Sequence, residues 1–357
     1  MTARLSLPDD RVMILGALDL ERTPAGVRPR RLPAWTRPRL SDSRMDLVVS
    51  QAAGVRLRLR TAARSLALGV HVTVSVMPDG ELPASFDLAV DGTVLARVRA
   101  KAGDVLTLGP ERADARLTPG PAEIVRFDDL PAGEKDVEIW LPHSATVELR
   151  TLETDAPLLV PTPPSGRAWV HYGSSISHGL EAIAPTLTWP AIAALTTGAA
   201  LTNLGFAGNA VLDPEVARAI RDSPADLVSL KVGINLIGEA SMRERTFVPA
   251  VHGFLDTIRE GHPTTPIVLI SPTAFRDRDA TTGTEVDSGT LTQTSVRTLL
   301  AKIVDLRADP ALHYLDGREL LGPDEASALP DGVHPDAAAH LRMGDRAGRL
   351  ILLPYLR

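Results

Sequence analysis

Up to about residue 153, apolar and polar residues alternate along the chain with a period of two. The clearest alternations cover residues 55–60, 71–77, 136–141 and 146–149. Such alternation is typical of half-buried β-strands, whose successive side chains point to opposite faces of a sheet. Asp91 and Gly92 separate the apolar runs 87–90 and 93–96, and both residue types tolerate the positive φ of a two-residue hairpin turn. Because no convincing helical pattern accompanies these strands, residues 1–153 are predicted to form an all-β sandwich or jelly roll with antiparallel strands.

The pattern changes after this region. The segment 154–166 carries four prolines, which disfavour both helix and central strand, so we expect an extended linker there. Beyond it, short apolar runs cover residues 168–172, 200–204, 226–232, 266–270 and 312–315. Stretches with helical spacing lie near 189–197, 214–222, 243–260, 291–307 and 335–350. Alternating strands and helices predict a three-layer α/β/α domain, 167–357, whose parallel sheet is covered on both faces.

Candidate catalytic groups follow the predicted strands of this second domain. In a parallel α/β sheet, ligands bind at the carboxyl ends of the strands. Ser175 follows the first strand, Gly208 the second and Asn235 the third, while Asp331 and His334 stand three residues apart before the last helix. Together these segments supply a hydroxyl, backbone N–H groups, an amide and a carboxylate with an imidazole. Those are the groups that acyl transfer requires.

These segments resemble, in the same order, the four sequence blocks of the SGNH/GDSL hydrolase family. The resemblance covers roughly residues 166–350, and the Asp-x-x-His block is its strongest match. It implies a flavodoxin-like SGNH-hydrolase fold for the second domain. It also implies that Ser175 is the nucleophile of a Ser-His-Asp triad, with His334 as its base and Asp331 as the group that orients the imidazole.

The same resemblance implies an oxyanion hole made of the N–H groups of Ser175 and Gly208 and the side-chain amide of Asn235. The sequence departs from the family at Ser174, where the family has Asp, and this places a rival hydroxyl beside Ser175. We prefer Ser175 because it holds the family's serine position. Ser174 and His178 remain candidate pocket residues.

Two further polar residues near these blocks are expected to have structural roles. His171 lies on a predicted strand, and Asn203 precedes a glycine in a predicted turn. The segment 271–295, rich in Thr, Asp, Arg and Gly, is expected either to close over the substrate or to form a solvated surface loop.

The long N-terminal region resembles that of two-domain family members, in which a sandwich similar to a carbohydrate-binding module precedes the catalytic domain. The activity that the resemblance favours is hydrolysis of a small O-acyl ester of a carbohydrate or secondary metabolite. An alternative is an O-acyltransferase that moves an acyl group from a thioester donor to a carbohydrate or polyketide hydroxyl. A third hypothesis is a non-catalytic carbohydrate-binding protein.

Composition narrows the classes of partner and cofactor. A chain of 357 residues favours two domains, and 44% hydrophobic with 23% charged residues is typical of a folded globular protein. The net charge of −6 comes with scattered basic residues, so nucleic acid is not an expected partner. The absence of Cys excludes disulfides and thiol nucleophiles. The histidines lack metal-ligand spacing such as His-Glu-x-x-His, so neither a metal nor a cofactor is expected.

The apolar runs are too short for a membrane role. No stretch approaches 18 consecutive apolar residues, and residues 1–10 lack the apolar core of a signal peptide. We therefore expect a cytoplasmic protein with no membrane partner.

Overall fold

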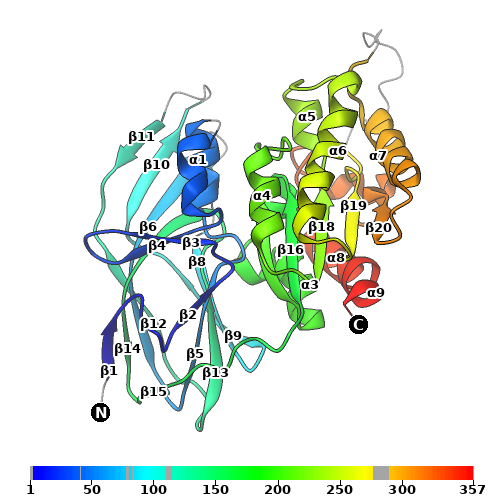
Figure 1. Cartoon of the computed structure of the whole chain (residues 1–357). Helices are drawn as coiled ribbons and strands as arrows, with labels where there is room; N and C mark the ends of the chain where they lie inside the picture. The colour runs from blue at the N-terminus through cyan, green and yellow to red at the C-terminus, as the bar shows by residue number, and fades with distance from the viewer. Residues whose placement is uncertain are drawn as a thin grey trace. The chain divides into compact units, whose positions relative to one another are not determined.

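The computed structural model describes residues 3–40, 42–77, 80–82, 84–109, 115–275 and 289–356. The chain divides into two compact units (Figure 1). Unit 1 is Met1–Pro164 together with Ile183–Thr186, and unit 2 is Ser165–Ala182 together with Leu187–Arg357. The division between Pro164 and Ser165 lies within the proline-rich segment 154–166.

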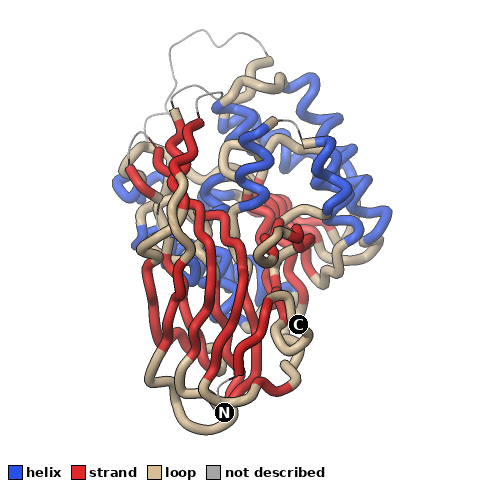
Figure 2. Tube along the Cα trace, turned by 90° about the vertical axis from the view of Figure 1, so that its left-hand side faces the viewer, coloured by secondary structure: helices blue, strands red, loops and turns tan. Residues whose placement is uncertain are grey.

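Unit 1 is built from two β-sheets, whose strands run as long tubes in Figure 2. Within the described residues, one sheet consists of β1 (Ala3–Ser6), β3 (Asp19–Arg22), β4 (Val27–Arg30), β6 (Leu66–Met77), β7 (Gly80–Glu81), β10 (Asp104–Leu108), β11 (Ala115–Thr118), β12 (Glu123–Phe127) and β14 (Ala145–Thr154). The other consists of β2 (Met13–Leu15), β5 (Arg56–Thr61), β8 (Ser85–Val90), β9 (Thr93–Arg99), β13 (Lys135–Trp140) and β15 (Leu158–Leu159). Alternate residues of these strands, among them Leu57, Leu59, Val70 and Val72, are buried in one apolar core. The predicted all-β fold of the N-terminal region is confirmed.

Three local features of unit 1 refine that prediction. Asp91 and Gly92 have φ angles of 47° and 82° and join β8 to β9, as the hairpin prediction requires. Strand β10 pairs with β6 in parallel, whereas antiparallel pairing was expected throughout. Strand β15 pairs with β5, so part of the proline-rich segment is regular structure.

The expectation that this region contains no helix is wrong for α1 (Ser43–Ser50). The Asp42 side chain accepts a hydrogen bond of 2.8 Å from the Met45 N–H and caps the helix. Met45 and Val49 are buried. The helix escapes pattern recognition because it is only eight residues long and contains β-branched valines. A short 3₁₀ helix, η1 (Ala34–Arg39), precedes it.

Unit 2 contains a parallel five-stranded sheet with the order β17-β16-β18-β19-β20. Its strands are β16 (Ala168–Gly173), β17 (Ala200–Gly205), β18 (Leu227–Lys231), β19 (Ile267–Ile270) and β20 (Leu312–Leu315). The described helices are α2 (Ser175–His178), α3 (Trp189–Thr197), α4 (Pro214–Asp222), α5 (Ile234–Gly238), α6 (Glu244–Gly261), α7 (Gln293–Arg307), η3 (Gly317–Glu319), η4 (Pro323–Ala328), α8 (Ala337–Ala347), η5 (Gly348–Leu352) and α9 (Leu353–Tyr355). The short helix η2 (Pro185–Leu187) begins in the residues assigned to unit 1 and ends at the first residue after them.

Helices cover both faces of this sheet (Figure 1). On one face, Trp169 of β16 packs against Trp189 of α3, with ring centroids 6.3 Å apart, and both belong to an apolar cluster shared with α8. On the other face, Tyr172 stacks on Phe254 of α6 at 5.3 Å. The predicted α/β/α layering is therefore confirmed, with the five long helices where periodicity placed them.

The parallel register brings the carboxyl ends of the strands to one edge. Gly173 at the end of β16 lies beside Gly205 at the end of β17. Two short helices that the sequence did not predict, α2 and α5, start at this edge directly after β16 and β18. Among the helices of the described residues, none is long and apolar enough to cross a membrane.

Candidate active site

Ser175 lies at the carboxyl edge of the sheet as the first residue of α2, and Ser174 is its N-cap. The N–H groups of Ser177 and His178 donate to the Ser174 carbonyl at 3.0 and 2.9 Å, which fixes the turn that leaves β16. Gly205 packs closely against this turn, and only glycine fits there, because a Cβ at this position would lie 2.4 Å from the His178 backbone nitrogen. The Ser175 N–H is in the first turn of a helix and therefore has no partner within that helix.

The structure brings Ser175, His334 and Asp331 together. The Ser175 Oγ lies 2.7 Å from His334 Nε2, and His334 Nδ1 lies 2.5 Å from Asp331 Oδ2. Because a carboxylate only accepts hydrogen bonds, the His334 proton belongs on Nδ1. Nε2 is then an acceptor that faces the serine hydroxyl.

Asp331 is held by its own loop. Its Oδ1 accepts hydrogen bonds from the N–H groups of Val333 and His334 at 2.8 and 2.7 Å. Gly332 adopts a φ of 82°, a left-handed conformation that glycine permits at little cost. Burial alone would raise the pKa of Asp331, but the hydrogen bonds from His334 and Val333 outweigh it and lower that pKa. Asp331 is therefore a carboxylate at neutral pH.

Asn235 and the loop that contains Gly208 are joined directly. The Ala210 N–H donates to Asn235 Oδ1 at 3.0 Å. Since a backbone N–H can only donate, this bond decides which end of the amide is oxygen and turns Nδ2 to the other side. Gly208 has a φ of 70°, and the space where a side chain would start is open.

Residues 167–351 match the sequence model of the GDSL-like lipase/acylhydrolase family. The chain belongs to this family. Among curated proteins, none matches the sequence. The predicted resemblance to SGNH/GDSL enzymes is thus confirmed.

Solved structures similar to this GDSL-like protein extend the likeness over both units. Salicylyl-acyltransferase SsfX3 from a tetracycline biosynthetic pathway is 31% identical, with a TM-score of 0.84 over 98% of this chain and 96% of its own. A putative GDSL-like lipase from Bacteroides ovatus is 20% identical, with a TM-score of 0.73 over 99% and 97%. A family two carbohydrate esterase from Cellvibrio japonicus is 13% identical, with a TM-score of 0.61 over 98% and 96%. The last two share the fold.

The other candidate pocket residues of the GDSL-like domain are buried beside α2. Ser174 is fully buried, and its Oγ has no hydrogen-bond partner among the described residues. His178, the last residue of α2, is also buried. Asn203 spans the turn as expected, because its Nδ2 donates to the Ser177 carbonyl at 2.9 Å and its Oδ1 accepts from the Gly205 N–H at 2.8 Å.

A buried polar network behind α2 was missed in the sequence. His171 Nε2 lies 2.8 Å from Ser177 Oγ, and its Nδ1 lies 2.7 Å from Ser229 Oγ, which also accepts from Trp169 Nε1 at 2.8 Å. Burial, reinforced by the nearby Lys231, lowers the pKa of His171 to about 3. His171 is therefore neutral and anchors α2 to the sheet, in agreement with its expected structural role.

Lys231 at the end of β18 is an unusual core residue. Its side chain is fully buried, and Nζ has no hydrogen-bond partner among the described residues. Burial, with a smaller contribution from the Arg297 cation, lowers the pKa of Lys231 to about 7. No sequence motif marked this residue, because its burial comes from long-range packing.

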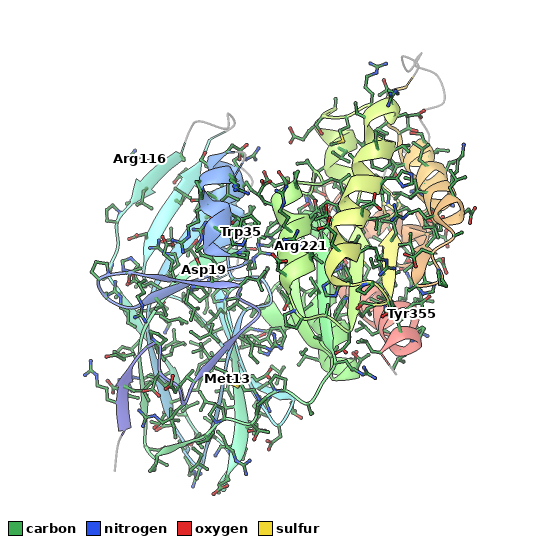
Figure 3. All side chains as sticks on the ribbon, in the orientation of Figure 1. Met13, Asp19, Trp35, Arg116, Arg221 and Tyr355 are labelled. Carbon is green, nitrogen blue, oxygen red and sulfur yellow. The ribbon has the colours of Figure 1, made fainter. Side chains whose placement is uncertain are left out.

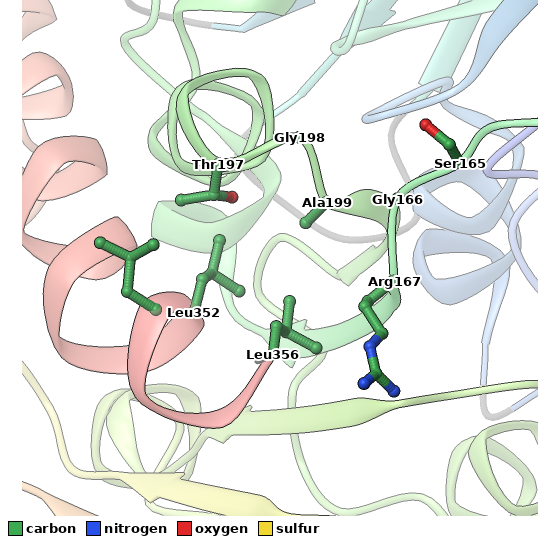
Figure 4. Close-up of a pocket in the computed structure, with 9 residues that line it drawn as sticks. Ser165, Gly166, Arg167, Thr197, Gly198, Ala199, Leu352 and Leu356 are labelled. Carbon is green, nitrogen blue, oxygen red and sulfur yellow. The ribbon is translucent and has the colours of Figure 1, made fainter.

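A separate hollow of about 400 Å³ lies at the opposite edge of the unit 2 sheet (Figure 4). Its lining comes from the residues before β16 and β17 and from the C-terminal segment: Ser165, Gly166, Arg167, Thr197, Gly198, Ala199, Leu352, Leu353 and Leu356. A six-residue strand such as β16 is about 20 Å long, so this hollow is remote from Ser175.

The predicted covering segment 271–295 lies partly outside the described residues, which resume at Gly289 and enter α7 at Gln293. Within the described ranges, no cluster of three or more His, Asp or Glu side chains is arranged to hold a metal ion.

Proposed function

We propose that this protein is a serine-dependent acyl-ester hydrolase that works through an acyl-enzyme on Ser175. The observation that carries the proposal is the pair of short contacts of His334, 2.7 Å to the Ser175 hydroxyl and 2.5 Å to the Asp331 carboxylate. A serine hydroxyl is a weak nucleophile at neutral pH and needs a base within hydrogen-bond distance. His334 is that base, and Asp331 fixes its tautomer and stabilises the imidazolium that forms.

The proton follows a defined route through two half-reactions. When the Ser175 Oγ attacks the ester carbonyl carbon, its proton moves to His334 Nε2 and the carbonyl oxygen becomes an oxyanion. When the tetrahedral intermediate collapses, the bond to the leaving oxygen or sulfur breaks, and His334 returns the proton to that atom. Water then attacks the acyl-enzyme and gives a proton to His334, which returns it to the Ser175 Oγ when the bond to the acyl carbon breaks and the free acid is released.

Three donors are suited to the oxyanion. The Ser175 N–H belongs to the first turn of α2, where backbone N–H groups have no partner within the helix. The Gly208 N–H lies on a loop with open space beside it. The bond from Ala210 to Asn235 Oδ1 occupies the oxygen end of the amide and leaves Nδ2 as its donor end. Preorganised donors of this kind stabilise developing charge without reorganisation, which supports their assignment as the oxyanion hole.

Acyl transfer to an alcohol is the second candidate function. It uses the same acyl-enzyme, with a natural-product hydroxyl in place of water and a thioester as the acyl donor. The likeness to a salicylyl-acyltransferase at 31% identity over 98% of this chain favours it. The carbohydrate esterases are 10–17% identical, and they support the fold alone.

The aromatic residues of unit 1 argue against a purely carbohydrate-binding role. They are Trp35, Phe86, Phe127 and Trp140. Three of them are buried, whereas Trp35 (labelled in Figure 3) is 38% exposed, with the Arg39 guanidinium carbon 5.7 Å from its ring centroid. A single exposed ring offers little stacking surface for a sugar chain. We therefore place the function in unit 2 and leave unit 1 as a carbohydrate-binding-module-like domain by resemblance only.

A fluorophosphonate probe tests the nucleophile and its position together. Intact-mass measurement should show one adduct on the wild type and on Ser174→Ala, and none on Ser175→Ala. Ser174→Ala is the matched control, because it removes an adjacent hydroxyl of the same size. An adduct on Ser175→Ala that Ser174→Ala lacks would move the nucleophile to Ser174, and an unlabelled wild type would contradict the proposed chemistry.

Product analysis separates hydrolysis from transfer. An acyl thioester or ester is supplied with and without a polyhydroxylated acceptor, and the acid and new ester are quantified. A hydrolase gives the same amount of free acid in both reactions, whereas a transferase forms new ester at the expense of free acid.

A further inference from the structure

His340 is a buried residue of α8 that binds the segment following the nucleophile's helix. The backbone N–H of Trp189 donates to His340 Nδ1 at 3.2 Å, and His340 Nε2 lies 3.0 Å from the Leu180 carbonyl oxygen. An N–H can only donate and a carbonyl can only accept, so the neutral ring with its proton on Nε2 satisfies both partners. Burial, with a smaller contribution from the His334 ring, lowers the pKa of His340 to about 4 and favours the neutral ring.

These contacts belong to a continuous path between the nucleophile and its base. The Leu180 N–H donates to the Ser175 carbonyl at 3.1 Å, and the Leu180 carbonyl accepts from His340 at 3.0 Å. The His340 N–H then donates to the Asp336 carbonyl at 3.0 Å. Asp336 is two residues after His334 in the chain. Three hydrogen bonds, one of them made by the His340 side chain, thus connect the backbone at Ser175 to the loop that carries His334.

Helix α8 is well suited to act as the rigid end of this path. Its first turn is capped by the Asp336 side chain, which accepts from the Ala339 N–H at 2.7 Å. Met343 and Ala347 anchor the same helix in the apolar cluster of unit 2. Because His340 projects from an anchored helix, its ring holds the segment after α2 at a fixed distance from the start of α8.

We propose that His340 is a positioning residue that sets the alignment of the Ser175 hydroxyl with the His334 ring. The proposal rests on the proposed function, because it assigns the alignment of a nucleophile and its base. Ser175 and His334 are 159 residues apart in the chain, and their contact depends on how two loops are held. A displacement of about 1 Å between reacting groups typically costs about a hundredfold in rate.

The test compares His340→Gln with His262→Gln. His262 is also buried in unit 2, and its Nε2 bonds the Ile220 carbonyl at 2.9 Å, but it follows α6 and contacts α4. Both variants replace a rigid, buried imidazole with a flexible amide, so His262→Gln is the control for lost stability. The measurements are the rate of fluorophosphonate labelling and the kcat and KM for p-nitrophenyl acetate, at a temperature where circular dichroism shows both variants folded.

We expect His340→Gln to lower kcat and the labelling rate by about tenfold to a hundredfold with little change in KM. His262→Gln should stay within about twofold of the wild type, as expected for a change remote from the reacting groups. Equal rates in the two variants would overturn the positioning role. A wild type that the probe does not label at Ser175 would instead contradict the proposed function, so the two failures are distinguishable.

If His340→Gln does not fold, ¹⁵N NMR of the His340 ring in the wild type replaces it. A ring that keeps its proton on Nε2 from pH 8 down to about 5 supports the path. A ring that protonates near the ordinary histidine pKa of about 6.5, or that carries its proton on Nδ1, overturns it.

Discussion

The Asn235→Asp substitution tests whether negative charge develops beside Asn235, the proposed oxyanion donor. The two side chains have the same shape, and the carboxylate retains the acceptor that binds the Ala210 N–H at 3.0 Å. The loop that carries Gly208 should therefore keep its conformation. What changes is the other end of the side chain, where a donor becomes an anionic oxygen.

The expected magnitude has two parts. Loss of one oxyanion donor costs about 3 kcal/mol, or roughly a hundredfold in kcat. A carboxylate about 4 Å from the oxyanion, at an effective dielectric constant of about 20, adds a repulsion of about 4 kcal/mol. The sum of about 7 kcal/mol corresponds to a loss of roughly 10⁵-fold in kcat. Asn235→Ala removes the donor without adding charge, so it should lose only about a hundredfold.

The assay is the steady-state kcat of the wild type and both variants with p-nitrophenyl acetate, together with their melting temperatures. The order of activity should be wild type, then Asn235→Ala, then Asn235→Asp, while Asn235→Asp melts close to the wild type. If Asn235→Asp were as active as Asn235→Ala, negative charge would not develop beside residue 235. An unchanged kcat in Asn235→Ala would remove this side chain from the oxyanion hole.

Two further predictions concern buried titratable groups. Lys231→Met should stabilise the protein by about 1–4 kcal/mol below pH 7, because an apolar side chain replaces an unpartnered buried amine. The gain should shrink as the pH rises from about 7 towards 10.5, where the unfolded lysine also becomes neutral. The measurement is the melting temperature of Lys231→Met, with Lys302→Met at an exposed site of α7 as the control variant. A melting temperature of Lys231→Met below that of the wild type would contradict the prediction. Acid should destabilise the fold between pH 6.5 and about 4, because His171 and His340 have lowered pKa values in the folded chain and the unfolded chain binds more protons in this range. The charged or titratable neighbours are Lys231 for His171, and His334 and Asp336 for His340. Urea titrations at pH 7, 6 and 5 should show a loss of up to about 1.4 kcal/mol per pH unit for each histidine, and His340→Gln should remove one of these contributions.

Helices that alternate with strands along the chain were predictable, because local patterning dominates them. Helices α3 (Trp189–Thr197) and α4 (Pro214–Asp222) have the residues that helical spacing predicts. The short helix α5 (Ile234–Gly238) carries too few residues for a period to register. The parallel pairing of β10 with β6 is set by tertiary contacts that alternation cannot encode.

The residues of the candidate site also fall into those that the sequence predicts and those that it does not. Ser175, His334 and Asp331 could be selected because their types and spacing match a known chemistry. The network of His171 and Ser229 could not, because it depends on the register that places these residues side by side on β16 and β18. His340 carries no motif either, and only the folded chain shows that its ring binds Leu180.

The turn at Gly332 holds Asp331 and His334 together as one structural unit. Asp331 and His334 bond to each other through both backbone and side chain within a single loop. Any movement of that loop carries the carboxylate and the imidazole together, so the pair stays assembled while its contact with the serine is made or broken. In the proposed mechanism, alignment of the three groups thus depends on one distance, between this loop and the start of α2, rather than on three independent ones.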